Sequence, residues 1–359
     1  MGIAVLEQEE LDTGSADGEQ LDPPWGASKT RETTQPLVLR PPGELISAAR
    51  RWGIVLAGGD GLRLRPLVEL ICGEKRPKQF CPLFDGCTLL AQTLRRAERT
   101  IPREHLLVSV VAKHRKWFLQ EDGLSRDQLI VQPVNRGTAP AVLHAVLSIA
   151  QIDENALVAI LPSDHYYSDE SLFARTLESA FLHAGEFPDA VMLLGAQPDH
   201  PEVGYGWIEL GAPLPPDELF RVRAFLEKPS REIAQKLYLK RDSVWNTFVM
   251  IGRVKAFLAV LQSALPELTA VLSRATMWRG RETHIERSLY KVLPFVDFSR
   301  QVLSSETERL LVLRLGDVGW SDLGDPRRVL DTFVARPAPE WVARWTQAHE
   351  EGSWRQKPA

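Results

Sequence analysis

The 359-residue chain has little of what marks several large classes of protein. It holds three cysteines, an odd count at spacings that match no zinc-binding pattern, so we expect reduced thiols. No apolar run approaches the roughly 18 residues that cross a membrane. The formal net charge of −4 provides no basic field for a polynucleotide. These absences predict a cytoplasmic protein with neither a nucleic-acid partner nor a membrane partner.

Two common nucleotide-binding signatures are also missing. The dinucleotide fingerprint G-x-G-x-x-G needs glycine at position 63, which is Arg63, whether the count begins at Gly58 or at Gly61. The Gly-Lys-Ser/Thr of the phosphate-binding P-loop does not occur. Instead, a short apolar strand that ends at Ala57 is followed by the basic loop Gly58-Gly59-Asp60-Gly61-Leu62-Arg63-Leu64-Arg65-Pro66.

This glycine-rich loop has the chemistry of a triphosphate site. Gly58, Gly59 and Gly61 let the backbone approach phosphates closely, and successive N–H groups of such a turn form an anion-binding nest. Arg63 offers a planar fork of donors, and Lys78, in the run Arg76–Phe80, offers a compact charge. An ordinary glycine turn after a buried strand is the alternative. The added basic residues favour the phosphate site.

The order of patterns along the chain predicts an α/β fold. Residues 1–28 carry seven acidic residues and no Lys or Arg, so residues 1–45 are predicted to be a disordered acidic tail, with a short helix over 44–51. Alternating strands and helices from Trp52 predict a Rossmann-like, mostly parallel sheet with helices on both faces, within one domain over residues 46–335. Residues 336–359 are predicted to be a helical extension whose Trp341 and Trp345 dock on the body.

Three motifs fall at the carboxyl ends of predicted strands. They are the glycine loop after the strand 54–57, Gln132 at the end of the strand 129–132, and Asp164 after the strand 156–161. Ligands of such sheets bind beyond that edge, so the motifs are expected to form one site. The second half is predicted to hold strands over 207–210, 221–226, 244–251 and 309–315, and helices over 233–239, 254–261 and 284–293.

Two aspartates are candidates for holding Mg²⁺. Asp164 lies in Pro-Ser-Asp-His and Asp322 in Gly-Trp-Ser-Asp, and Mg²⁺ prefers one or two carboxylates together with phosphate oxygens and water. Either aspartate could equally close a turn.

Further polar groups suit a base or a sugar, although each could also serve plain packing. Gln132 offers both a donor and an acceptor to a base edge, Thr138 is a plausible helix N-cap, and small residues beside it let a flat base approach. Glu227 can accept hydrogen bonds from hydroxyls, and Lys228 can pair with a phosphate. Gly204-Tyr205-Gly206 and Trp245-Asn246 offer a tight turn and an amide beside aromatic rings.

Taken in order over about residues 52–325, these motifs resemble the sugar-1-phosphate nucleotidyltransferases, and most of all their mannose-1-phosphate guanylyltransferase branch. The resemblance implies the nucleotide-diphospho-sugar transferase fold, here with no β-helix or cupin domain. It implies that a hexose 1-phosphate, mannose 1-phosphate as first guess, attacks the α-phosphorus of a nucleoside triphosphate, GTP as first guess. Pyrophosphate leaves and a nucleotide sugar forms. The cofactor implied is Mg²⁺.

The resemblance also assigns roles to residues. Arg63 and Lys78 would be catalytic, and Asp164 and Asp322 would hold the metal. The nucleotide would be bound by Ala57, Gly58, Gly59, Gly61, Gln132, Asn135, Thr138 and Ala139. The sugar phosphate would be bound by Gly204, Tyr205, Gly206, Glu227, Lys228 and Asn246.

Four positions depart from the family pattern. Leu62 replaces Thr or Ser, Arg65 replaces Trp, Gln132 stands where Glu is common, and Phe248 replaces Gly. They leave open another base or sugar, and also a non-catalytic homologue that binds a sugar nucleotide in a regulatory role. The oligomeric state is open too, a homodimer included.

Overall fold

A computed structural model describes residues 48–350 apart from 122, 216–217, 280–281, 286 and 335. All of the described residues belong to one compact unit. The predicted acidic tail lies outside them, as does the end of the predicted helical extension. Of the helix predicted over 44–51, the described part is a single 3₁₀ turn, Ala48–Arg50, because Arg51 already begins the first strand.

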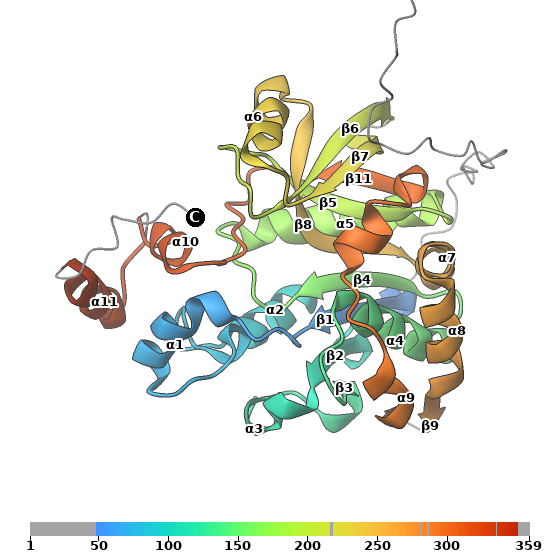
Figure 1. Cartoon of the computed structure of the whole chain (residues 1–359), viewed down its shortest axis with the longest axis horizontal. Helices are drawn as coiled ribbons and strands as arrows, with labels where there is room; N and C mark the ends of the chain where they lie inside the picture. The colour runs from blue at the N-terminus through green and yellow to red at the C-terminus, as the bar shows by residue number, and fades with distance from the viewer. Residues whose placement is uncertain are drawn as a thin grey trace, which may run out of the picture. The chain divides into compact units, whose positions relative to one another are not determined.

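A nine-stranded sheet with the order β3-β2-β1-β4-β8-β5-β11-β7-β6 forms the centre of the fold (Figure 1). Seven of these strands run in one direction, and β7 and β8 run against them. The predicted fold class is confirmed. The strands are β1 (Arg51–Leu56), β2 (Leu106–Val111), β3 (Leu129–Gln132), β4 (Leu157–Pro162), β5 (Val191–Ala196), β6 (Gly206–Leu214), β7 (Leu219–Glu227), β8 (Ser243–Arg253) and β11 (Leu310–Arg314).

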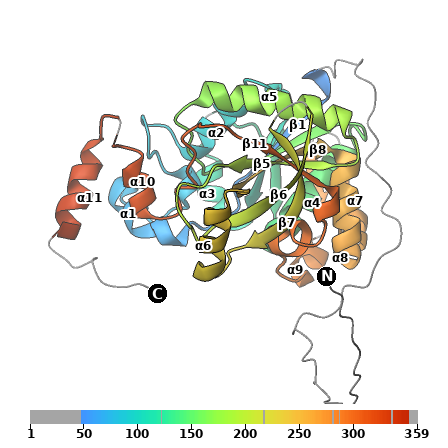
Figure 2. The same cartoon turned by 90° about the horizontal axis from the view of Figure 1, so that it is seen from above.

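Helices cover both faces of the sheet (Figure 2). One face packs against α2 and α5, and the other against α4, α7, α8 and α9. The helix α4 is buried on nearly all sides because it lies between the sheet and the pair α7 and α8. None of the described helices is long and apolar enough to cross a membrane. The helices are α1 (Arg65–Cys72), α2 (Leu89–Ala97), α3 (Arg115–Phe118), α4 (Thr138–Ala150), α5 (Glu170–Glu186), α6 (Arg231–Lys240), α7 (Val254–Ala264), α8 (Pro266–Ala275), α9 (Arg287–Val292), α10 (Pro326–Asp331) and α11 (Glu340–Glu350).

Parallel pairing brings the ends of several strands to one edge of the sheet. β1 pairs in parallel with β2 on one side and with β4 on the other. A Cβ atom on Gly53 of β1 would lie 2.5 Å from Leu106 Cδ2, so a larger residue there would require the Leu106 side chain to move. Because β1, β3 and β4 share one direction, their carboxyl ends and the loops that follow meet at the same edge of the sheet.

A separate apolar cluster packs α1, the helix that follows the glycine loop, against the last two described helices, α10 and α11. Figures 1 and 2 both show α10 and α11 beside α1. The cluster contains Leu67 of α1, Val329 of α10, and Trp341 and Trp345 of α11. The two tryptophans lie one helical turn apart and are both buried, so α11 presents one apolar edge to this cluster.

One predicted helix is wrong in part. The helix expected over 284–293 is limited to α9, because His284 lies in a two-stranded hairpin that the prediction missed. Its strands are β9 (Thr276–Arg279) and β10 (Glu282–Ile285), which pair antiparallel with Thr283 opposite Trp278. Thr, Trp and Ile are weak helix formers, and the pairing satisfies their backbone groups instead.

Replacing Trp345 with alanine is expected to lower the free energy of unfolding by about 3–5 kcal/mol, because the buried indole leaves a cavity in the cluster between α1 and α11. Urea denaturation followed by circular dichroism measures the change. The matched control is Gln347→Ala, on the exposed side of the same helix. Equal stabilities of the two variants would contradict this packing.

Replacing His144 with leucine is expected to make the protein less sensitive to acid. Burial lowers the pKa of His144 in α4 from 6.5 to about 4, and neither ring nitrogen has a hydrogen-bond partner among the described residues. Below pH 6.5 the unfolded chain protonates this ring while the folded chain does not, so wild-type stability falls as the pH drops from 6.5 to 4. Leucine removes about 3 kcal/mol of that loss. Unfolding free energies of both proteins at pH 7 and pH 4.5 test this, and parallel pH profiles would refute it.

Candidate functional site

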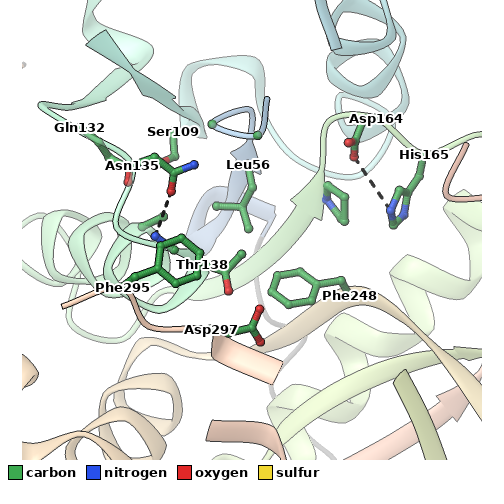
Figure 3. A pocket seen from close by; sticks show the side chains of 15 residues that line it. Leu56, Ser109, Gln132, Asn135, Thr138, Asp164, His165, Phe248, Phe295 and Asp297 are labelled. Atoms are coloured by element: carbon green, nitrogen blue, oxygen red, sulfur yellow. Dashed lines mark hydrogen bonds and ion pairs between the residues drawn. The ribbon is translucent and has the colours of Figure 1, made fainter. Parts of the chain in front are cut away.

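A cavity of about 280 Å³ lies at the edge where β1, β3 and β4 end (Figure 3). Gln132 and Asn135 stand at one end of it and Asp164 and His165 at the other, with Phe248 and Asp297 between them. The three motifs at the strand ends therefore line one cavity. Its lining comprises Leu56, Gly58, Gly59, Ser109, Gln132, Asn135, Gly137, Thr138, Ala141, Pro162, Asp164, His165, Phe248, Phe295 and Asp297.

The glycine loop is held in shape by side chains from two other segments. The Gln79 amide donates hydrogen bonds of 2.9 Å to the carbonyls of Ala57 and Gly59. The Asp60 carboxylate pairs with the Lys113 ammonium at 2.5 Å and meets His114 Nε2 at 3.0 Å. Burial alone would raise the pKa of Asp60, but the Lys113 charge and hydrogen bond outweigh it and lower that pKa. Contacts within the protein thus organise the loop.

The glycines of this loop differ in what surrounds them. Gly61 adopts φ +58°, and a Cβ atom there would lie 3.1 Å from the backbone nitrogen of Lys78, so both its conformation and its space require glycine. A Cβ on Gly58 would lie 3.5 Å from Gln132 Nε2, whereas one on Gly59 would meet nothing within 4 Å. Gly59 therefore presents bare backbone to open space, as phosphate approach requires.

Gln132 forms the buried end of the cavity. Its Nε2 donates to Ser109 Oγ at 2.9 Å, and its Oε1 accepts from the Tyr290 hydroxyl at 2.7 Å. These bonds fix the amide, and they leave one N–H and one lone pair for a ligand. Ser109 and Tyr290 were not found from the sequence, because neither belongs to a recognisable motif.

The loop before α4 is shaped differently from the expectation. Thr138 is not the N-cap: the N-cap is Gly137, at φ +89°, and the Thr138 hydroxyl instead accepts a 2.7 Å bond from the Phe298 amide. A Cβ on Gly137 would lie 2.2 Å from the carbonyl oxygen of Val296, so the two segments touch there. Asn135 and Thr138 line the cavity, whereas Ala139 is fully buried behind it.

Lys78 meets both predicted metal-binding segments. Its ammonium lies 3.2 Å from Asp164 Oδ2, and it donates to the main-chain carbonyls of Asp322 at 2.7 Å and Leu323 at 3.2 Å. The side chain is only 11% exposed. Arg63, by contrast, is exposed, does not line the cavity, and has no hydrogen bond or ion pair to another described residue.

The two carboxylates have distinct surroundings. Asp322 Oδ1 accepts from Arg328 at 2.8 Å, from the Gly324 amide at 2.8 Å and from the Tyr205 hydroxyl at 3.0 Å. Burial alone would raise the pKa of Asp322, but the positive charges of Arg328 and Lys78 outweigh this effect. The net pKa is lowered, so the carboxylate is ionised at neutral pH. Burial also lowers the pKa of His165, beside Asp164, to about 4, which keeps this ring neutral.

No three His, Cys, Asp or Glu side chains among the described residues gather into a metal site. Mg²⁺ does not need three, because it takes one or two carboxylates and completes its shell with phosphate oxygens and water. Lys78 brings the two segments together, because its ammonium contacts the Asp164 carboxylate and the main-chain carbonyl of Asp322, whereas the Asp322 carboxylate is bonded to Arg328.

The predicted sugar-binding residues divide into two groups. Gly206, Glu227 and Asn246 converge: a Cβ on Gly206 would lie 2.8 Å from Glu227 Oε2 and 3.3 Å from Asn246 Cβ. Burial raises the pKa of Glu227, whose Oε1 lies 3.6 Å from Lys228 Nζ. Gly204 and Tyr205 instead face Arg328 and Asp322. None of these six residues lines the cavity of Figure 3.

Phe248 forms a strained wall between the cavity and the converging group. Its φ of +59° is a conformation that bulky side chains rarely adopt, and it costs of order 1–3 kcal/mol. Asn246 Oδ1 supports the turn by accepting the Phe248 amide hydrogen bond at 3.0 Å. Such strain at a cavity wall points to a functional constraint on the position of the ring.

Phe295 and Asp297 were not predicted from the sequence. They reach the cavity because the backbone between them pairs with the loop before α4: the Val296 amide donates to the Arg136 carbonyl at 2.9 Å, and its carbonyl accepts from Ala139 at 3.1 Å. Phe295 is 67% exposed, so the cavity has an apolar ring at its open rim.

Comparison with known proteins places the chain in a family. The model of the nucleotidyl transferase family matches residues 52–336. A mannose-1-phosphate guanylyltransferase of Escherichia coli is 28% identical over 287 residues, which cover 76% of this chain and 59% of that protein. The alginate biosynthesis protein AlgA of Pseudomonas syringae is 30% identical over 281 residues, 76% of this chain and 56% of its own length. The chain thus spans just under three fifths of these relatives.

Comparison with solved structures finds the same family and fold. A Thermus thermophilus protein described as a mannose-1-phosphate geranyltransferase is 30% identical with a TM-score of 0.69, over 80% of both chains. A putative glucose-1-phosphate thymidylyltransferase of Bacillus anthracis, only 14% identical with a TM-score of 0.52, shares the fold over 81% of this chain and 99% of its own. The chain therefore belongs to the nucleotidyl transferase family, among the sugar-1-phosphate nucleotidyltransferases.

Proposed function

We propose that this protein transfers a nucleotidyl group from a nucleoside triphosphate to a hexose 1-phosphate and releases pyrophosphate. GTP and mannose 1-phosphate are the first choices, because the named relatives include guanylyltransferases of mannose 1-phosphate. The observation that carries the proposal is the Lys78 ammonium, placed between the glycine loop and the Asp164 carboxylate at the edge of the cavity. Activity measured as pyrophosphate release across a matrix of triphosphates and hexose 1-phosphates tests it.

The chemistry asks for positioning and charge neutralisation rather than for a protein nucleophile. A phosphate oxygen of the sugar attacks the α-phosphorus in line, and the bond to the leaving pyrophosphate breaks. The glycine-loop amides would cradle the triphosphate, and Arg63, which has no partner among the described residues, would swing onto its outer phosphates. Lys78 would exchange its carbonyl partners for the two reacting phosphates, which it would hold in contact.

Asp164 and Asp322 would hold Mg²⁺, which when bound supplies positive charge to the phosphate oxygens. The ionised state of Asp322 suits this role. Asp164 lines the cavity, so a triphosphate lying along the glycine loop would pass beside it.

The base and the sugar would lie on opposite sides of Phe248. Gln132 and Asn135 would contact the base edge, and the exposed ring of Phe295 would offer it a stacking surface. Glu227 and Asn246 would orient sugar hydroxyls, and Lys228 would pair with the sugar phosphate. A regulatory homologue without activity would bind the same ligands but release no pyrophosphate with any pair of substrates.

Replacing Lys78 with alanine, or Asp164 with asparagine, is expected to lower kcat by about 10²–10³-fold, because each change removes a charge aimed at the reacting phosphates. Lys75→Ala is the matched control, since Lys75 is an exposed lysine of the same segment. Far-ultraviolet circular dichroism checks that all three variants fold. Near-normal turnover in both site variants would remove these residues from the mechanism.

Replacing Gln132 with glutamate is expected to raise the preference for GTP over ATP by about tenfold, because a carboxylate accepts more strongly from the N1–H and exocyclic amine of guanine. The fold should tolerate the change: Tyr290 already donates to Oε1, and the Ser109 hydroxyl can rotate to donate to the other oxygen. The ratio of kcat/KM values for the two triphosphates measures the effect. An unchanged ratio would place the base elsewhere in the cavity.

A further inference from the structure

The guanidinium of Arg328 joins two segments of the site that are far apart in the chain. Arg328 lies in α10, and its Nη1 is 2.8 Å from Asp322 Oδ1 while its Nη2 pairs with Glu202 Oε2. The side chain is only 16% exposed, and its guanidinium carbon lies 4.4 Å from the centre of the Tyr205 ring. One cation thus pairs with two carboxylates from separate segments, and with the nearby Asp325 carboxylate at 3.5 Å, while it stacks on an aromatic face.

Gly324 leaves room for this guanidinium. A Cβ on Gly324 would lie 2.8 Å from Arg328 Nη1, whereas one on Gly204 would make an ordinary van der Waals contact of 3.5 Å with Nη2. The partners of the guanidinium are fixed in turn: Glu202 Oε1 accepts from the Gly204 amide at 2.5 Å, and the Tyr205 hydroxyl donates to Asp322. A planar, forked cation fits this arrangement, and a lysine ammonium would reach only one carboxylate at a time.

The bonds continue from Arg328 to Lys78. Asp322 uses its carboxylate toward Arg328 and its main-chain carbonyl toward the Lys78 ammonium, at 2.7 Å. Asp322 is therefore held at its side chain by Arg328 and at its main chain by Lys78. The helix α10 that carries Arg328 is itself fixed against α1 through the cluster that contains Val329 and Leu67.

We propose that Arg328 is a positioning residue for the transfer reaction, which couples the Gly204–Gly206 loop to Lys78 through Asp322. Its charge is not expected to touch either substrate. The kinetic part of the proposal rests on the proposed function, whereas the coupling to Lys78 can be measured without any substrate.

Three variants test the coupling. Arg328→Gln removes the charge, Arg328→Lys keeps the charge but loses the fork, and Arg327→Gln is the matched control at an exposed neighbour. The first readout is the rate at which acetic anhydride labels Lys78 in the intact protein, followed by peptide mass spectrometry, with the exposed Lys75 as internal standard. Labelling of Lys78 relative to Lys75 should rise in Arg328→Gln, rise less in Arg328→Lys, and stay at the wild-type value in Arg327→Gln.

The second readout is steady-state kinetics with the best substrate pair. Arg328→Gln should lower kcat by about 10²-fold, as misplacement of a reacting group by about 1 Å does, while the KM for the triphosphate changes little. Arg328→Lys should recover part of kcat. Should Arg328→Gln fail to fold, Glu202→Gln, which removes one partner of the fork, is expected to change both readouts in the same direction.

Unchanged Lys78 labelling in Arg328→Gln would overturn the proposal, and so would a fall in activity matched by Arg327→Gln. If no substrate pair gives turnover in the wild type but the labelling responds as expected, the coupling stands and the proposed function fails.

Discussion

The Lys78 ammonium is the group on which the arrangement of this site depends. A nearly buried ammonium must be surrounded by acceptors, and here they come from two places: the Asp164 carboxylate at the end of β4, and the main chain at Asp322 and Leu323, over 240 residues away. The same lysine packs against Gly61, whose φ of +58° shapes the glycine loop. The loop, the end of β4 and the Gly-Trp-Ser-Asp segment therefore cannot be placed independently. The apolar cluster of α1, α10 and α11 includes Leu64 and Leu323, and so packs directly beside the glycine loop and the Gly-Trp-Ser-Asp segment.

The two ends of the cavity differ in their polar contacts and in their charge. At the Gln132 end, polar groups are already paired, with Ser109 and Tyr290 holding the amide in one orientation. A ligand there meets a fixed pattern of donors and acceptors, which favours selection of a base by shape and hydrogen bonding. At the Asp164 end, charge dominates: among the described residues, the partners of the Lys78 ammonium are one carboxylate and two main-chain carbonyls, which phosphates are proposed to replace in part. This division suits a reaction in which the nucleotide is recognised at one end and reacts at the other.

Much of this could be predicted from the sequence because the informative patterns are local. The apolar run before Gly58 and the repeating strand–helix order predict parallel strands, and parallel strands bring Gly58, Gln132 and Asp164 to one edge whatever the intervening loops do. Asp297 could not be predicted, since it enters the cavity through backbone pairing of Val296 with Arg136 and Ala139, some 160 residues earlier. The role of Arg328 could not be predicted either. An arginine in a short helix is usually exposed on the surface, and only the folded structure brings Glu202 and Asp322 into contact with it.

Phe248 lies between the proposed sugar-binding group around Asn246 and the cavity whose Gln132 end is proposed to bind the base. Its φ of +59° persists only if the surroundings enforce it, and two contacts do so. Asn246 Oδ1 accepts the Phe248 amide hydrogen bond, and the Phe248 ring meets the Phe298 ring edge-on, with centroids 6.1 Å apart. Phe298 in turn donates its amide hydrogen bond to Thr138, at the start of α4. Phe248 is thus packed on a residue that is bonded to the start of α4, beside the proposed base-binding end of the cavity. If the base and the sugar bind as proposed, the wall between them is therefore a single packed unit.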